Sequence, residues 1–95
     1  MRTLKLMADY DCFPLWEILD NDLKNIDPSD LPLSNKLRNS LKIWSDKYNA
    51  TLNYDDPINS GFESEIDEQK FEQEGEALFK FLKKELGREF RIIRS

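Results

Sequence analysis

Hydrophobic and polar residues alternate at both ends of the chain. From Thr3 to Ala8, the residues Leu4, Leu6 and Ala8 fall on one side, and the segment 89–94 alternates in the same way. A period of two is typical of a strand that buries one face. We therefore expect one strand at each end of the chain and expect the two strands to pair.

A helical period replaces this alternation in the middle of the chain. Ser34 stands where a helix N-cap belongs, and four apolar residues follow at spacings of four, three and four. These residues are Leu37, Leu41, Trp44 and Tyr48. Such spacing places them on one face and predicts an amphipathic helix over about residues 35–50.

A second, longer helix is predicted over about residues 64–86. It opens at Ser64 and places one apolar face along its length, before Gly87 ends it as the C-cap. The face consists of Phe71, Gly75, Leu78 and Leu82. A glycine inside a helix costs about 1 kcal/mol relative to alanine, so we expect another element to approach closely at Gly75.

The connecting segments carry weaker patterns. Pro14 and the residues after it could open a single helical turn, and the many Asn, Asp, Pro and Ser residues of 20–33 predict a surface connection. Residues 51–54 fit equally a continuation of the first helix or a short strand, and we favour a helix that frays near residue 50. The expected fold is a single α+β domain over residues 1–95, in which two or three strands pack against two helices.

Composition supports a folded chain. Of the 95 residues 39% are hydrophobic, and two Trp, three Tyr and six Phe supply large core side chains. There is no export signal and no apolar run long enough to span a membrane. A lone cysteine, Cys12, fits a reducing compartment. We therefore expect a cytoplasmic protein with no membrane partner.

Charge is distributed unevenly around a net value of −5. Residues 51–75 carry eight acidic side chains and one basic side chain, whereas residues 35–50 carry four basic and one acidic. Lys and Arg supply most of the affinity of proteins for phosphate backbones. The balance therefore argues against direct nucleic-acid binding and favours a basic protein partner.

Few residues suggest catalysis. The chain has no histidine, which removes the commonest general base and the commonest zinc ligand. Asp9 with Asp11 and Asp55 with Asp56 could hold a cation, but the Gly and Glu positions of a calcium loop are missing. We expect no enzyme activity, metal or cofactor, and interpret these carboxylates as turn caps or as partner contacts.

Aromatic and acidic residues mix in the segment 9–16, as they do where aromatic anchors lie inside a charged rim. Phe13 and Trp16 are expected to be buried, while Tyr10 could be either core or surface. The residues that we expect to contact a partner are Asp9, Tyr10, Asp11, Tyr54, Asp55, Asp56, Glu63 and Glu65.

Most of the chain also resembles a known group of proteins, the short acidic bacterial immunity proteins of contact-dependent inhibition and other polymorphic toxin systems. The segments that carry the resemblance are 7–16, 31–34, 50–53, 55–57, 60–62, 74–75 and 85–87. The resemblance implies a cytosolic antidote that binds and blocks a cognate toxin domain, often a nuclease, and it implies no active-site residues.

Two other classes of protein remain open. The chain could be a structural or regulatory interaction protein that self-associates, or docks on another bacterial complex, through a strand edge or its basic helix. It could also be a carboxylate-dependent hydrolase that uses a divalent ion. The sequence leaves the toxin, the oligomeric state and the mode of inhibition undetermined.

Overall fold

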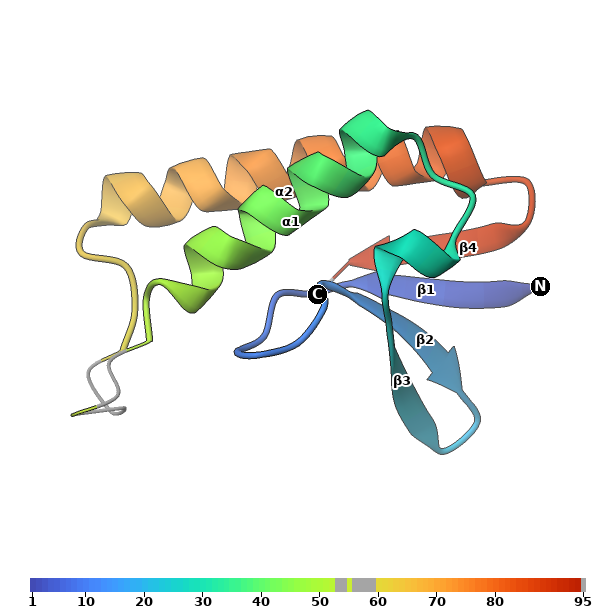
Figure 1. The fold of residues 1–95 in the computed structure, drawn as a ribbon, viewed down its shortest axis with the longest axis horizontal. Coiled ribbons are helices and arrows are strands. Elements are labelled where there is room, and N and C mark those ends of the chain that lie inside the picture. Colours follow the sequence, from blue (N-terminus) through green and yellow to red (C-terminus); the bar gives the residue numbers. More distant parts are fainter. Residues whose placement is uncertain (53–54, 56–59, 95) are drawn as a thin grey trace.

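The computed structural model describes residues 1–52, 55 and 60–94. In this part of the chain, a mixed sheet lies on one side and two long helices lie on the other (Figure 1). The elements in chain order are β1 (Arg2–Leu6), β2 (Leu15–Leu19), β3 (Asp22–Ile26), the 3-10 turn η1 (Pro28–Asp30), α1 (Asn35–Asn49), α2 (Glu65–Leu86) and β4 (Phe90–Arg94).

The two terminal strands pair, as the sequence predicts, and they run parallel. Leu4 of β1 stands opposite Ile92 of β4. The sheet nevertheless has four strands in the order β3-β2-β1-β4, because β2 pairs antiparallel with β1 and β3 with β2. The expected α+β class is confirmed, and the predicted number of two or three strands is wrong.

The β2–β3 hairpin is the feature that the sequence pattern does not predict. The expected helical turn after Pro14 is a strand, and much of the expected surface connection is β3. Leu19 pairs with Asp22, so only Asp20 and Asn21 make the turn. The short hairpin gains its stability from pairing with β1, which a local pattern does not reveal.

The first helix ends where we expect. Its last residue is Asn49, and Ala50 is its C-cap. Thr51 and Leu52 belong to no strand. Residues 53 and 54, the other half of the alternative strand, lie outside the described part of the chain.

Both predicted helix starts are confirmed. The Ser34 hydroxyl accepts a hydrogen bond from the Leu37 amide at 3.2 Å, and the Ser64 hydroxyl accepts one from the Asp67 amide at 3.2 Å. Each side chain satisfies an amide that the first turn leaves without an intrahelical partner. The caps fix where α1 and α2 begin, and the apolar stripe of each helix determines which face packs on the sheet.

The core lies between the helices and one face of the sheet. Its most buried side chains come from both layers and include Leu4, Leu6, Leu15, Leu41, Leu82 and Leu86. Trp44 of α1 stacks on Phe71 of α2 with ring centroids 4.4 Å apart, and its indole N–H donates to the Phe71 carbonyl at 2.9 Å. This pair joins the later part of α1 to the early part of α2.

Gly75 lies directly against this pair. A Cβ atom at Gly75 would come within 2.8 Å of the Trp44 ring and 2.5 Å of the Arg94 guanidinium. The close approach that the sequence predicts is confirmed, because a side chain at this position would push apart α1, α2 and β4.

We expect Gly75→Ala to destabilise the fold by about 1–3 kcal/mol, since the overlap with buried Trp44 outweighs the gain in helix propensity. Urea unfolding measures the change. Gln73→Ala, at an exposed position of the same helix, is the control and should have little effect. Equal stability of Gly75→Ala and wild type would contradict this packing.

An ion pair at the end of the sheet ties β1 to β2. The Arg2 guanidinium donates two hydrogen bonds to buried Glu17, at 2.7 and 2.9 Å. These bonds hold the pKa of the Glu17 carboxyl below its ordinary value. A lowered pKa in the folded state means that the pair adds stability above the unfolded pKa, about 4.3, and loses it as the pH falls through the folded pKa.

We therefore expect Glu17→Gln to be less stable than wild type at neutral pH and the difference to shrink under acid conditions. Thermal unfolding measured from neutral pH to about pH 3 tests this. Glu89→Gln, at an exposed position, should follow the wild-type profile. A Glu17→Gln deficit that stays constant with pH would show that the carboxylate charge is not what stabilises the strand pair.

Candidate protein-binding site

The loop between β1 and β2 carries three of the predicted contact residues. Tyr10 stacks on Tyr48 of α1 with centroids 4.7 Å apart, and its hydroxyl shares a hydrogen bond of 2.9 Å with the Thr51 hydroxyl. Asp9 and Asp11 on either side are exposed. The half-buried tyrosine therefore fixes two outward-facing carboxylates against the end of α1.

Further bonds hold the loop backbone. Asp11 has a φ of 57°, a left-handed conformation that Asp tolerates better than most residues. Its amide donates to the Asn49 side-chain oxygen at 2.9 Å, and the Ser45 hydroxyl donates to the Cys12 carbonyl at 3.3 Å. The loop is thus bound to α1 at two residues about one helical turn apart.

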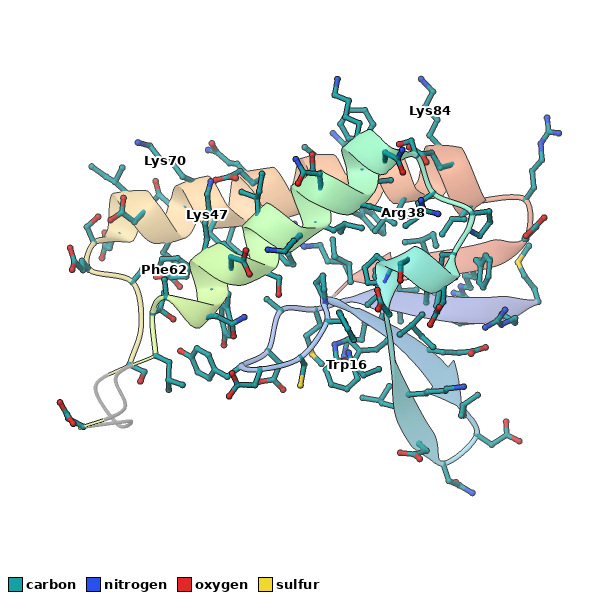
Figure 2. The ribbon with its side chains drawn as sticks, in the orientation of Figure 1. Trp16, Arg38, Lys47, Phe62, Lys70 and Lys84 are labelled. Carbon is teal, nitrogen blue, oxygen red and sulfur yellow. The ribbon has the colours of Figure 1, made fainter. Side chains whose placement is uncertain are left out.

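The segment before α2 reaches the same aromatic cluster. Phe62 packs on Phe71 with centroids 5.0 Å apart, and Tyr48 packs on Phe71 at 5.7 Å. Figure 2 shows Phe62 beside the end of α1. Glu63 and Glu65, which follow Phe62, are exposed. The aromatic contacts therefore link the β1–β2 loop to the start of α2 through Tyr48 and Phe71.

An open groove of about 760 Å³ runs between the end of α1 and the start of α2. Asp55, Glu63 and Asp67 are among its lining residues, and so are Lys47 and Lys70. Asp55 is exposed. Two of the predicted contact residues, Asp55 and Glu63, thus line the same groove.

Several acidic side chains near this groove take part in no internal ion pair. Among the described residues, no ion pair involves Asp9, Asp11, Glu63 or Glu65. Three acids in the middle of α2 form ion pairs instead. The Glu74 carboxylate lies 2.7 Å from the Lys47 ammonium, and Arg94 binds Glu72 at 2.7 Å and Glu76 at 3.1 Å. Negative charge is therefore left at the start of α2 and removed from its middle.

Burial raises the pKa of Tyr48 above its ordinary value, and the neighbouring Tyr10 and Asp9 add to the rise. Tyr48 therefore remains a neutral phenol to a higher pH than an ordinary tyrosine does. It therefore serves as an uncharged platform for Tyr10, and the charge of the loop comes from Asp9 and Asp11.

Two predicted contact residues, Tyr54 and Asp56, lie outside the described part of the chain. The structure also corrects two expectations about burial. Phe13, expected in the core, is 46% exposed, and Trp16 is only half-buried. Trp16 belongs to the segment in which a helical turn is expected and β2 (Leu15–Leu19) is found, and Phe13 lies in the loop just before this strand.

A second groove of about 510 Å³ lies between the loop, the hairpin and α1. Asp11, Phe13, Asn25, Arg38 and Asn49 are among its lining residues. Sequence reasoning missed Asn49 as the residue that fixes the loop, because a single Asn near a helix end can bond to many different groups.

Two further features concern metal ligands and the apolar character of the helices. No three His, Cys, Asp or Glu side chains in this part of the chain come together as metal ligands would. None of the helices seen there has the length and apolar character needed to cross a membrane.

The fold and the site define a small α+β domain with an acidic loop that hydrogen bonds hold against α1. The chain belongs to the Serratia CdiI immunity protein-like family, whose model matches residues 2–94. This match confirms the resemblance to contact-dependent inhibition immunity proteins and indicates a toxin-neutralising binding role. No individual curated protein matches the chain.

We expect Asn49→Ala to loosen the loop, because the Asp11 amide loses its acceptor at a cost of about 1 kcal/mol. Hydrogen exchange at the Asp11 amide should become faster while exchange in the sheet is unchanged. The exposed Asn39→Ala on the same helix is the control. Unchanged exchange at Asp11 would show that Asn49 does not hold the loop.

Proposed function

We propose that the chain is a non-catalytic immunity protein that binds and neutralises a cognate toxin, a basic nuclease domain, in the cytoplasm. The binding surface, here called the acidic end, consists of Asp9, Asp11, Asp55, Glu63 and Glu65 with Tyr10 as an anchor. Tyr54 and Asp56 complete the set that the sequence predicts.

One observation carries the proposal: the carboxylates of Asp9, Asp11, Glu63 and Glu65 are exposed and take part in no ion pair among the described residues. A carboxylate that an internal cation already neutralises has less to offer a partner. These four keep their full charge for a partner, whereas Glu72, Glu74 and Glu76 do not.

The hydrogen bonds that hold the β1–β2 loop favour tight binding. Hydrogen bonds from Tyr10 and from the Asp11 amide fix the loop before any partner arrives. A surface that is already ordered loses less conformational entropy on binding than a mobile one. The half-buried Tyr10 ring offers an aromatic contact inside a charged rim, the arrangement of many binding hot spots.

A nuclease is the class of toxin that this charge fits. Nucleases bind phosphate backbones with Lys and Arg side chains. A negative surface attracts such a cleft and accelerates the association of the two proteins. It also competes with the nucleic acid for the Lys and Arg side chains of the cleft. The negative charge of the acidic end is therefore complementary to the positive charge of a nucleic-acid-binding cleft.

We expect the triple variant Asp9→Lys, Glu63→Lys, Glu65→Lys to bind the toxin at least about a hundredfold more weakly, which corresponds to about 2.8 kcal/mol. Its affinity should also depend less on salt, because fewer opposite charges meet. Calorimetry with the purified toxin domain at low and high salt measures both quantities.

The matched control is Asp20→Lys, Asp30→Lys, Glu89→Lys, which changes the net charge equally at exposed sites away from the acidic end. It should lose only the small part of the affinity that depends on overall charge. Equal losses in the two triple variants would mean that net charge, and not the acidic end, determines binding.

Co-purification from the native host identifies the toxin. We expect a protein with a basic nuclease domain to accompany the chain and to lose its nuclease activity in the complex. A toxin of another activity would contradict the nuclease assignment while leaving the binding role intact.

A further inference from the structure

One face of the sheet has no helix over it. Figure 1 shows α1 and α2 on the same side of the strands, and the buried sheet residues, such as Leu4, Leu15 and Ile92, point to that side. Because side chains alternate along a strand, the residues between them form the other surface. We call this surface the open face: Thr3, Lys5, Trp16, Ile18, Leu23, Asn25, Arg91 and Ile93.

The open face is more apolar than a solvent-facing sheet surface normally is. Ile18 and Leu23 stand opposite each other across β2 and β3 and are 37% and 41% exposed. Trp16 and Ile93, both half-buried, stand on either side of Lys5. Apolar side chains grouped in this way on a surface indicate a contact with another molecule.

The charge of the open face is opposite to that of the whole chain. Its charged side chains are Lys5 and Arg91, and neither takes part in an ion pair among the described residues. An occupant of this face needs an apolar group to cover Ile18 and Leu23, and carboxylates to pair with the two cations.

The chain itself carries a surface with that chemistry at the start of α2. Ile66 is 64% exposed, and the exposed acids Glu65, Asp67 and Glu68 surround it in sequence. No ion pair among the described residues neutralises these three acids. The helix start therefore offers one exposed apolar side chain with carboxylates on the neighbouring faces of the helix.

These two surfaces cannot meet within one molecule. The start of α2 lies in the helical layer at one end of the molecule, and the β2–β3 hairpin projects away from that end (Figure 1). We propose that the open face of one copy docks the start of α2 of a second copy. The contact adds a self-association surface to the proposed function, and because it uses Glu65 of the acidic end, toxin and second copy compete for the start of α2.

The contact joins two different surfaces, so each copy can both dock and be docked. Association of this kind continues along a chain of copies unless the geometry closes a ring. The net charge of −5 opposes association over long distances. At physiological salt that repulsion is screened beyond about 8 Å, and the local pairing of unlike charges at the contact is retained.

Analytical ultracentrifugation of the purified chain tests the proposal. The average mass of the wild type should rise with protein concentration at about 50 mM salt and fall back toward the monomer at about 500 mM. Two double variants each disable one of the two surfaces. Lys5→Glu with Arg91→Glu disables the open face, and Glu65→Lys with Glu68→Lys disables the helix start.

Each of these variants alone should remain monomeric. The face variant retains a working helix start and the helix variant a working open face, so an equal mixture of the two should form a heterodimer. Lys83→Glu with Lys84→Glu, two exposed cations outside both surfaces, is the matched control and should associate like the wild type.

Tryptophan fluorescence gives a second measurement. Trp44 is buried and stacked, so a shift of the emission to shorter wavelength on association reports the covering of half-exposed Trp16. Circular dichroism confirms that each variant is folded. A monomeric wild type at every concentration, a mixture that fails to associate, or a control that loses association would overturn the proposal.

Discussion

The stacking of Trp44 on Phe71 is the contact on which the other parts of the structure depend. The two rings are nearly parallel, with planes 5° apart, and the indole N–H donates to the Phe71 carbonyl. The stack and the hydrogen bond therefore both hold α1 and α2 at the same distance and orientation. The missing side chain of Gly75 makes room for it. Because the buried indole donor keeps a hydrogen-bond partner, the contact is specific as well as hydrophobic.

The acidic surface is built outward from this stack. Tyr48 and Phe62 pack against Phe71, and Tyr10 packs against Tyr48. Each step brings an acidic segment to the same end of the molecule. Ion pairs then decide where charge remains, because Lys47 and Arg94 neutralise acids in the middle of α2. Packing and ion pairing together leave the charge on the β1–β2 loop and at the start of α2.

Elements with a strong local signal could be predicted from the sequence. Ser34 and Ser64 cap the two helices as expected, and Gly75 marks the predicted close approach, because caps and helix faces depend on residues only a few positions apart. The hairpin could not be predicted in this way. Glu17 interrupts the apolar pattern of β2, and its burial is explained only by Arg2, which lies 15 positions away and reaches it across the sheet.

The candidate site was predictable in part for the same reason. Composition and charge pattern single out the acidic residues and Tyr10. They do not single out Asn49 and Thr51, which hold the site, since the role of both comes from the way the β1–β2 loop lies on α1. Large aromatics are usually buried, which is why Phe13 and Trp16 were expected inside, but strand pairing turns Trp16 to the open face and leaves Phe13 exposed before β2.

Hydrogen–deuterium exchange of the chain, free and bound to its toxin, tests most directly whether the acidic end is the binding surface. We predict that binding slows exchange in the β1–β2 loop around residues 9–12, at the end of α1 and in residues 60–65, and leaves the β2–β3 hairpin unchanged. Protection confined to the hairpin or to the C-terminal end of α2, with the loop exchanging as in the free protein, would contradict this assignment.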